Sequence, residues 1–587
     1  MKILLLHPSD AFDDPRWSNT HWDLIVDLGI SSQDRSEFWA KKLGCPVHQM
    51  HLLRSREHDF RRLREVFVAG CGRLLDRNGL DWWRIMSILL HEQLEAVLLI
   101  QRLRHELPGQ SSVYCSRGEW PVTGLIQALR VQPHIFRPEG PPRFASRLHR
   151  YSRAARRLSF SQIRDVIFDK YDAAYRWRSR WHRISDVSER SVVLVPTAYS
   201  NVSRSAAAYA RMLPQQEFLF VATRESALTF DVPSNVRVEK LAAFARSRPD
   251  PEEVERLLKS WDKLRQELQL IPEIAILESV GALGGFGSLL RQGIALRNAW
   301  SKAISRGNAT AVFCGDDSNH TTRIAVEVAS ARGIPTVDFH HGALDGRYLF
   351  KTLPSEVYLA KGEMERDYLV GTCGLHPARI IVGGPPRAFS HPGEKTQTRD
   401  RVVLFSEPYE NQGARPMEIY QEIIPPLLHL CRSAGTRLVI KLHPFESKSE
   451  RECLMRKLLS AKDLELVDLV TGPMSEDLLN TTWFGVTVES TAALDCASRG
   501  VPCFLCSWLE ISAYGYVQQY ARFGVGQILK SASELLSIPA FLQAQPVEAK
   551  AIDNIWSPIS PDELRDYLVG KTSGVHQKQL TSFGMSA

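Results

Sequence analysis

The chain has 587 residues, which is too long for a single hydrophobic core, so two or three domains are expected. Hydrophobic residues make up 44% and charged residues 24%, and these ordinary values argue against global disorder and against a membrane-embedded chain. The formal net charge of +7 is mild for this length; it suits an anionic substrate or surface without implying nucleic acid. Ten scattered cysteines favour reduced thiols and a cytoplasmic setting.

Residues 1–136 predict an amino-terminal α/β region. The apolar run Ile3–Leu6 is too short for a signal peptide or a membrane span and indicates a first strand. The run Ile85–Ile100 is longer, but polar residues interrupt it, which favours an amphipathic core helix. The loop His7–Asp10 follows the first strand where ligands often contact such sheets, or it is a simple strand-ending turn. Further strands are predicted at Leu24–Val26 and Ser112–Cys115.

Residues 137–190 predict a basic helical segment. Between Arg137 and Arg183 thirteen Lys or Arg residues stand against four Asp or Glu residues, with aromatic residues interleaved. Such a segment is typical of helices that lie on anionic lipid headgroups or contact an anionic glycan. The alternative is a solvated basic helix that packs its aromatic side chains on a neighbouring domain. A peripheral position on a membrane is therefore one expectation, and no nucleic-acid partner is expected.

Residues 191–396 predict a Rossmann-like domain. A strand at Val192–Pro196, a helix at Ala206–Leu213 and a strand at Glu217–Ala222 open a parallel sheet covered by helices. The first turn lacks a GxGxxG motif, so the sequence supports no dinucleotide site there. Glycines, prolines and a polar run then mark a linker that ends near Thr396.

Two acidic residues and a histidine end neighbouring strands of this domain. Asp316 and Asp317 follow the strand Ala311–Cys314, where a carboxylate can accept a proton from a hydroxyl nucleophile. The alternative is that Asp317 or Ser318 caps the helix that follows. His341 ends the next strand before a glycine and can act on protons or phosphate. A metal site is disfavoured because no third ligand stands at a suitable spacing.

Residues 397–571 predict a second Rossmann-like domain, followed by a polar tail over residues 572–587. The strand RLVIK delivers Lys441, His443 and Pro444 to its carboxyl end, where open α/β sheets bind their ligands. A later strand leads into a small-residue turn and a helix. That helix begins at a turn of three polar residues whose free N–H groups suit an anion, namely Glu489, Ser490 and Thr491. Together the two loops predict a site for a phosphate-bearing ligand.

These motifs resemble those of GT-B-fold glycosyltransferases of bacterial surface-polysaccharide synthesis. His443-Pro444 and Ser490-Thr491 are similar to the HP and S/T motifs of sialyltransferases and related transferases that use CMP-sialic-acid or CMP-Kdo donors. The resemblance covers about residues 191–535. It implies that His443, Ser490 and Thr491 hold the donor nucleotide and that a general base lies at Asp316-Asp317, although Ser318 stands where the family has glycine.

The resemblance also leaves rival functions open. His341-Gly342 with Lys441-x-His443-Pro444 is similar to the HG and KxHP pair of CDP-glycerol glycerophosphotransferases, which would make both histidines important. A sugar-nucleotide 2-epimerase shares the fold, and a non-catalytic scaffold in a polysaccharide assembly complex is the rival outside enzymology. The expected fold class is α/β and GT-B-like, with two Rossmann-like doubly wound domains facing a cleft. The expected activity is transfer of a sugar from a nucleotide-activated donor to a glycan or glycolipid, without a cofactor or metal.

Overall fold

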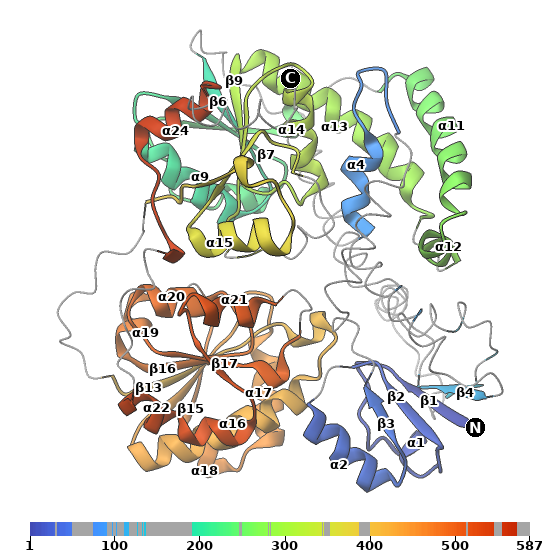
Figure 1. Cartoon of the computed structure of the whole chain (residues 1–587), viewed down its shortest axis with the longest axis vertical. Helices are drawn as coiled ribbons and strands as arrows, with labels where there is room; N and C mark the ends of the chain where they lie inside the picture. Colours follow the sequence, from blue (N-terminus) through green and yellow to red (C-terminus); the bar gives the residue numbers. More distant parts are fainter. Residues whose placement is uncertain are drawn as a thin grey trace. The chain divides into compact units, whose positions relative to one another are not determined.

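The structure is a computed structural model that describes most of the chain. The described residues are 1–29, 32–49, 74–90, 111–116, 134–136, 191–245, 249–279, 283–342, 353–386, 399–472, 474–511, 515–544 and 554–571, with 97, 101, 126, 132, 281 and 344 singly. The basic segment and the polar tail predicted from the sequence lie outside them. The described strands form three parallel sheets (Figure 1).

The amino-terminal sheet has five strands in the order β3-β2-β1-β4-β5. They are β1 (Lys2–Leu6), β2 (Leu24–Asp27), β3 (Val47–Gln49), β4 (Ser112–Cys115) and β5 (His134–Ile135). Helices α1 (Pro15–Ser18) and α2 (Gln33–Leu43) follow β1 and β2. The apolar residues of β1 are fully buried because β1 pairs with β2 on one side and β4 on the other. The predicted α/β region thus has the strand order of a doubly wound sheet.

The second sheet has seven strands in the order β8-β7-β6-β9-β10-β11-β12. They are β6 (Val192–Thr197), β7 (Glu217–Ala222), β8 (Val236–Lys240), β9 (Ala309–Cys314), β10 (Thr336–Phe339), β11 (Val357–Ala360) and β12 (Ile380–Val382). Its helices are α9 (Ser200–Met212), α10 (Leu241–Phe244), α11 (Pro251–Leu268), α12 (Pro272–Ser279), α13 (Phe286–Arg306), α14 (His320–Ser330) and α15 (Glu363–Asp367). The central strands are continuous apolar runs because helices cover both faces of the sheet.

The third sheet has six strands in the order β15-β14-β13-β16-β17-β18. They are β13 (Arg401–Phe405), β14 (Arg437–Lys441), β15 (Val467–Val470), β16 (Thr482–Thr487), β17 (Cys503–Cys506) and β18 (Gln527–Leu529). The helices α16 (Pro416–Ala434), α17 (Lys448–Leu458) and α18 (Ala461–Leu464) lie on one face, and α20 (Ala492–Ser498) and α21 (Tyr516–Arg522) on the other (Figure 1). Two further helices complete this region, α19 (Glu476–Thr481) and α22 (Ile538–Ala544).

The chain divides into two compact units that do not follow the sequence order. One unit holds the first and third sheets, and the other holds the second sheet. Helix α4 (Trp82–Met86) belongs to the second-sheet unit, where a Cβ on Gly293 would lie 2.3 Å from the Trp82 ring. Helix α24 (Pro561–Leu568) also belongs there, because its buried Leu564 and Leu568 join the core of that sheet. The sequence analysis had placed α24 in the domain of residues 397–571 and α4 in residues 1–136.

The predicted fold class is confirmed. The second and third sheets are parallel, helix-covered and ordered as Rossmann-like sheets, and an α/β region precedes them in the chain. Among the described residues, each helix is either too short or too polar to span a lipid bilayer.

Candidate functional site

The predicted site residues fall into two groups, one on each larger sheet. In the third sheet the strand order reverses between β13 and β16, and in the second between β6 and β9. Ligands of open α/β sheets bind outside the carboxyl ends of the strands at such a reversal. We call these places the β13–β16 edge and the β6–β9 edge. Each belongs to a different unit, so the expected approach of the two groups across a cleft stays a prediction.

Lys441 ends β14 beside the β13–β16 edge, and its ammonium is already engaged. The side chain is 7% exposed, and Nζ donates to Gly472 O at 2.6 Å and to Leu442 O at 3.1 Å. Burial lowers the pKa of Lys441, while the Glu446 carboxylate opposes that shift. Lys441 therefore links the loops after β14 and β15. Its ammonium is bound to two carbonyls, so it contributes positive potential to the edge.

His443 is held in one tautomer by its own loop. Its Nδ1 accepts a hydrogen bond from the Phe445 N–H at 3.2 Å, so the ring proton resides on Nε2 when the ring is neutral. Burial, with the charge of Lys441, lowers the pKa of His443 and favours that neutral form. The half-buried ring thus presents an Nε2–H donor. Pro444, next in the chain, is exposed and supplies no N–H of its own.

Glu446 fixes the loop that carries His443. Its fully buried carboxylate accepts from the His443 N–H at 2.7 Å, from Ser406 Oγ at 2.8 Å and from Arg451 Nε at 2.7 Å. Arg451 in turn donates both Nη groups to Glu410, at 2.5 and 2.6 Å. Glu446 was not predicted from the sequence, although a carboxylate three residues after His443 is visible there.

The His-Pro turn itself is a local structure rather than a mark of a binding site. In His7-Pro8-Ser9 the Ser9 N–H donates to His7 Nδ1 at 3.1 Å, and in His376-Pro377-Ala378 the Ala378 N–H donates to His376 Nδ1 at 3.3 Å. The three turns share one geometry at three unrelated places. What distinguishes His443 is its position beside the β13–β16 edge, next to Lys441.

A buried glutamate shapes the turn that contains the predicted Ser-Thr motif. Glu407 Oε1 accepts from Thr487 Oγ1 at 3.1 Å and from the Glu489 N–H at 2.9 Å. Thr487 Oγ1 then accepts from the Ser490 N–H at 3.2 Å. Glu407, two residues after the end of β13, was not predicted from the sequence.

The Ser-Thr motif precedes helix α20. Ser490 is half-buried, and its Oγ accepts from the Ala492 N–H at 3.3 Å, whereas Thr491 is exposed and makes no side-chain cap bond. Glu489 is buried and lies near the Tyr520 hydroxyl, whose pKa is raised chiefly by burial and further by Glu489. Because β13 separates β14 from β16, the ends of these two strands lie about 10 Å apart. His443 and Ser490 can therefore contact different parts of one nucleotide-sized ligand.

The acidic pair after β9 is buried and already engaged. Asp316 Oδ1 accepts from Ser318 Oγ at 2.5 Å, and Asp317 lies 3.9 Å from the buried guanidinium of Arg323. Neither residue caps α14; Asn319 does, by accepting from the Thr321 N–H at 3.0 Å. The capping alternative raised from the sequence for Asp317 and Ser318 is therefore wrong.

The His341 ring carries its proton on the opposite nitrogen from the His443 ring. Its Nδ1 lies 3.4 Å from Gly315 O, a carbonyl that can only accept, so the proton resides on Nδ1 and Nε2 is left as an acceptor. Lys361 holds the backbone on both sides of His341, because its buried ammonium donates to His340 O and to Gly342 O. Burial lowers the pKa of Lys361. Gly315 thus joins β9 to the histidine after β10, which places His341 at the β6–β9 edge with the acidic pair.

A second histidine at this edge is electrostatically different. Burial, with a smaller contribution from the positive charge of Arg224, lowers the pKa of His320 to about 4. Arg224 Nη1 also donates to the Tyr199 hydroxyl at 2.7 Å, at the start of α9. His320 is thus a neutral ring at physiological pH.

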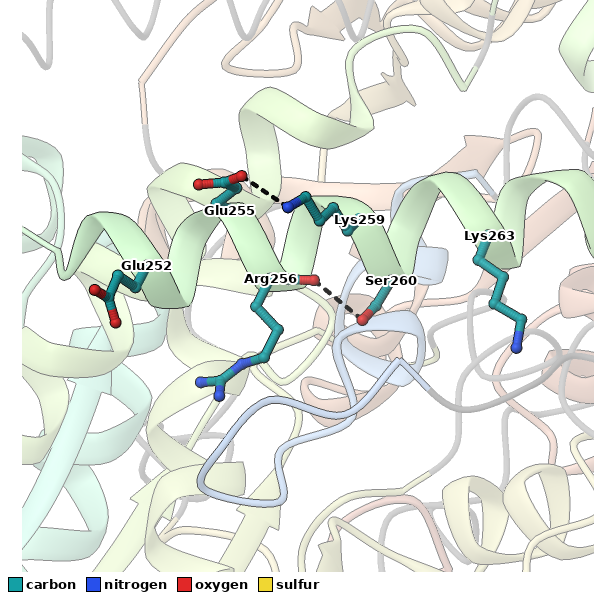
Figure 2. Close-up of a pocket in the computed structure, with 6 residues that line it drawn as sticks. All are labelled: Glu252, Glu255, Arg256, Lys259, Ser260 and Lys263. Atoms are coloured by element: carbon teal, nitrogen blue, oxygen red, sulfur yellow. Dashed lines mark hydrogen bonds and ion pairs between the residues drawn. The ribbon is translucent and has the colours of Figure 1, made fainter.

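A hollow elsewhere in this unit lies along helix α11 (Figure 2). Its described lining is six exposed residues of that one helix, namely Glu252, Glu255, Arg256, Lys259, Ser260 and Lys263. The Glu255–Lys259 ion pair and the bond from Ser260 to Arg256 O lie within the helix (Figure 2). These side chains converge on no common point, so the hollow is not a candidate site. The part of the chain that the structure describes also contains no cluster of His, Cys, Asp and Glu suited to a metal ion.

No protein-family model and no curated protein matches the chain. Solved structures that resemble it include the UDP-GlcNAc 2-epimerase from Neisseria meningitidis bound to UDP-GlcNAc, at 14% identity and a TM-score of 0.40, covering 66% of this chain and 99% of that one. The UDP-GlcNAc 2-epimerase from Methanocaldococcus jannaschii has 13% identity and a TM-score of 0.41, over 67% and 100%. CalG4, a calicheamicin glycosyltransferase, has 12% identity and a TM-score of 0.37, over 68% and 100%. These TM-scores are low, so the likeness assigns no function.

The strand orders and the two groups of polar side chains define an α/β protein with Rossmann-like sheets and two candidate ligand edges. Lys441, His443, Glu489 and Ser490 gather at or beside the β13–β16 edge, and Asp316, Asp317 and His341 at the β6–β9 edge.

Proposed function

We propose that the protein is a glycosyltransferase that takes a sugar from a nucleotide-activated donor. The observation that carries the proposal is the fixed Nε2–H donor of His443 beside the β13–β16 edge, with Ser490 and Thr491 after β16. A phosphate needs hydrogen-bond donors and positive potential as charge develops on it in the transition state. His443, Ser490, Thr491 and the charge of Lys441 supply these.

The chemistry of the β6–β9 edge complements this role. Transfer to a hydroxyl needs a group that accepts the hydroxyl proton, and His341 Nε2 is an acceptor because Nδ1 faces Gly315 O. Asp316 and Asp317 already interact with Ser318 and Arg323, so they support the edge electrostatically. We therefore assign the general base to His341 and orientation of the acceptor to the acidic pair.

The donor and acceptor classes follow from the sequence motifs. The HP and S/T motifs favour a CMP-linked sugar of the sialic-acid or Kdo type, and a surface glycan or glycolipid is the acceptor. The basic residues 137–183 would bring the enzyme to an anionic membrane surface. A glycerophosphotransferase would use the same two histidines on CDP-glycerol, so the choice of nucleotide separates the two functions.

A nucleotide panel tests the proposal. We expect CMP, among CMP, CDP, UDP and GDP, to raise the unfolding temperature most, because a ligand that binds the folded state stabilises it by mass action. At a nucleotide concentration near the wild-type Kd, the shift should fall close to zero in His443→Ala and persist in His376→Ala, which removes the same kind of turn at another place. A response to UDP alone contradicts the CMP-sugar donor, and a response to CDP alone favours glycerophosphate transfer. A nucleotide shift that survives in His443→Ala contradicts the site.

Turnover separates a transferase from an epimerase. Incubation with the nucleotide sugar of the best-bound base should release free nucleotide faster when a glycan acceptor is added. An isomerised sugar formed without acceptor would identify an epimerase instead. Binding without turnover of any donor would favour the scaffold function.

A further inference from the structure

The carboxyl edge of the amino-terminal sheet is occupied by a side chain of the chain's own third-sheet region. Arg415, just before α16, donates from Nη1 to Asp27 Oδ2 at 2.8 Å and from Nη2 to Asp27 Oδ1 at 2.5 Å. Its Nε donates to Asp10 O at 2.9 Å, in the loop after β1. Asp27 ends β2 and its side chain is 0% exposed, and that of Arg415 is 7% exposed. An arginine thus fills the place where such a sheet otherwise holds a ligand.

The amino-terminal region is shaped for this guanidinium. A Cβ on Gly29 would lie 2.6 Å from the guanidinium carbon of Arg415, so only glycine permits the approach. The Phe12 ring lies 4.9 Å from the same carbon, at a distance typical of a cation–π contact. A buried ion pair of this kind is stable only when its hydrogen-bonding groups are satisfied, and here each of the three guanidinium nitrogens donates.

Arg415 ends the loop that supports both halves of the β13–β16 edge. Residues 406–415 join β13 to α16. At their start, Glu407 binds Thr487 Oγ1 and the Glu489 N–H. Further along, Glu410 accepts both Nη groups of Arg451, the residue that also binds Glu446 and through it the loop of His443. A shift of this loop therefore reaches the His-Pro turn and the Ser-Thr turn together.

We propose that Asp27 and Arg415 are positioning residues for the nucleotide site. The amino-terminal sheet holds Arg415, and Arg415 fixes the 406–415 loop so that Glu407 and Glu410 keep the two turns in their binding geometry. The amino-terminal sheet is then a support for the donor site rather than a second nucleotide site. The assignment of a nucleotide rests on the proposed function, but the mechanical link to the two turns does not.

Three single variants of the full chain test this link. Asp27→Asn removes the charge of the pair without changing its shape, and Arg415→Lys keeps the charge but loses the paired Nη donors. Glu253→Gln is the matched control: Glu253 binds Arg297 at 2.6 and 2.9 Å with both side chains 1% exposed, in the other unit. Amide hydrogen exchange is measured by mass spectrometry without ligand, well below the unfolding midpoint of each variant. Nucleotide affinity is measured at the same temperature.

We expect peptides containing the amides of His443 and Glu489 to exchange on the order of tenfold faster in Asp27→Asn, and less so in Arg415→Lys. Glu253→Gln should leave those peptides unchanged even if it lowers the unfolding temperature. The Kd for the nucleotide should rise by a similar factor in the first two variants only.

Unchanged exchange at both amides in Asp27→Asn and Arg415→Lys overturns the positioning role, whatever the nucleotide data show. Should Asp27→Asn fail to fold, Arg415→Lys decides the question alone. Faster exchange in a protein whose wild type binds no nucleotide supports the mechanical link and contradicts the proposed function. The two failures are therefore distinguishable.

Discussion

The β13–β16 edge and the β6–β9 edge present the same kind of side chain in opposite states. His443 accepts at Nδ1 from the Phe445 N–H and carries its proton on Nε2, whereas His341 faces Gly315 O with Nδ1, so that its Nε2 is an acceptor. Their surroundings agree with this difference. The charge beside His443 is that of Lys441, and the charges at the other edge include the two aspartates after β9. The β13–β16 edge therefore presents a hydrogen-bond donor to an anion, and the β6–β9 edge presents a nitrogen that can accept a proton.

The sequence motif places a histidine at each edge, and the backbone group that contacts its Nδ1 determines which ring nitrogen carries the proton. In a His-Pro-X turn, the N–H two residues on reaches Nδ1, so the remaining proton points away from the turn. In His341-Gly342, Nδ1 faces the carbonyl of Gly315, just after β9, and a carbonyl can only accept, so Nδ1 carries the proton. A donor and a base thus arise from one residue type through one backbone contact each.

Removing the proposed general base is expected to give the largest effect. His341→Ala should lower kcat for transfer by about 10²- to 10⁴-fold, the usual contribution of a general base, while the donor Kd stays unchanged. Initial rates of nucleotide release with acceptor, together with donor titrations, measure the two quantities. Asp317→Asn is the companion variant and should cost less, because Asp317 is paired with Arg323. A His341→Ala enzyme with normal kcat would show that the proton goes elsewhere.

Removing the anion donor should give the converse result. His443→Ala is expected to weaken nucleotide binding by about 10- to 100-fold, since a hydrogen bond to a charged phosphate contributes roughly 1.5–3 kcal/mol. Calorimetric titration with the best nucleotide measures the change. In the control His376→Ala the same turn is lost on a different element, and affinity should not change. Equal losses in both variants would mean that the effect comes from the turn and not from a phosphate contact.

Much of the two larger sheets follows from the sequence alone. The strand Glu217–Ala222 is predicted residue for residue, because a buried parallel strand is a continuous apolar run between turn residues. The helix expected to begin at the turn of Glu489, Ser490 and Thr491 is α20, which starts at Ala492. The edge strands β8 and β18 were missed: VRVEK and QIL carry too few apolar residues to stand out.

The supporting residues could not be predicted in the same way. Glu407 and Glu446 follow strands at recognisable places, but their partners lie on other strands and loops, so their roles require the folded register. Arg415 and Asp27 are separated by nearly four hundred residues in the sequence, and no local sequence pattern predicts that they pair. Helix α24 likewise returns to the second sheet from the far end of the chain. Long-range partners are therefore the part of the site that only the structure reveals.

The pH dependence of stability sharpens the distinction between the two histidines of the β6–β9 edge. The pKa of His320 is lowered to about 4, chiefly by burial, against 6.5 for the unperturbed ring. Between those values the unfolded chain binds a proton that the folded chain does not, so stability falls as the pH drops from about 6.5 to about 4. We expect this group to contribute on the order of 2 kcal/mol of that loss.

Urea unfolding midpoints at neutral and mildly acidic pH measure the effect. His320→Gln should flatten the acid dependence, whereas His429→Gln, on an exposed position of α16, should not. An acid dependence that is identical in the wild type and in His320→Gln would show that the His320 ring is not held neutral.

Asp495 gives the smallest expected effect and the finest test of the anion edge. It lies in the first turn of α20, just after Ser490 and Thr491, and burial raises its pKa from 3.8 to about 6. The stability that its protonated form contributes is fully present below about pH 3.8 and is lost as the pH rises through 6, so at pH 7 the folded protein carries a half-buried carboxylate. Asp495→Asn should stabilise the protein at pH 7 by on the order of 1–2 kcal/mol, measured by urea unfolding, with no gain below pH 4.

Nucleotide binding by Asp495→Asn also tests which part of a ligand the β13–β16 edge binds. If α20 receives only an anion, removing a negative charge from its first turn should tighten nucleotide binding a fewfold at low salt, and less at high salt because the charge is screened. Weaker binding in Asp495→Asn would instead mean that the carboxylate accepts hydrogen bonds from ligand hydroxyls. The β13–β16 edge would then hold a sugar or ribose as well as a phosphate. The two edges would in that case differ in the part of the ligand that they bind, and not in the charge that they bind.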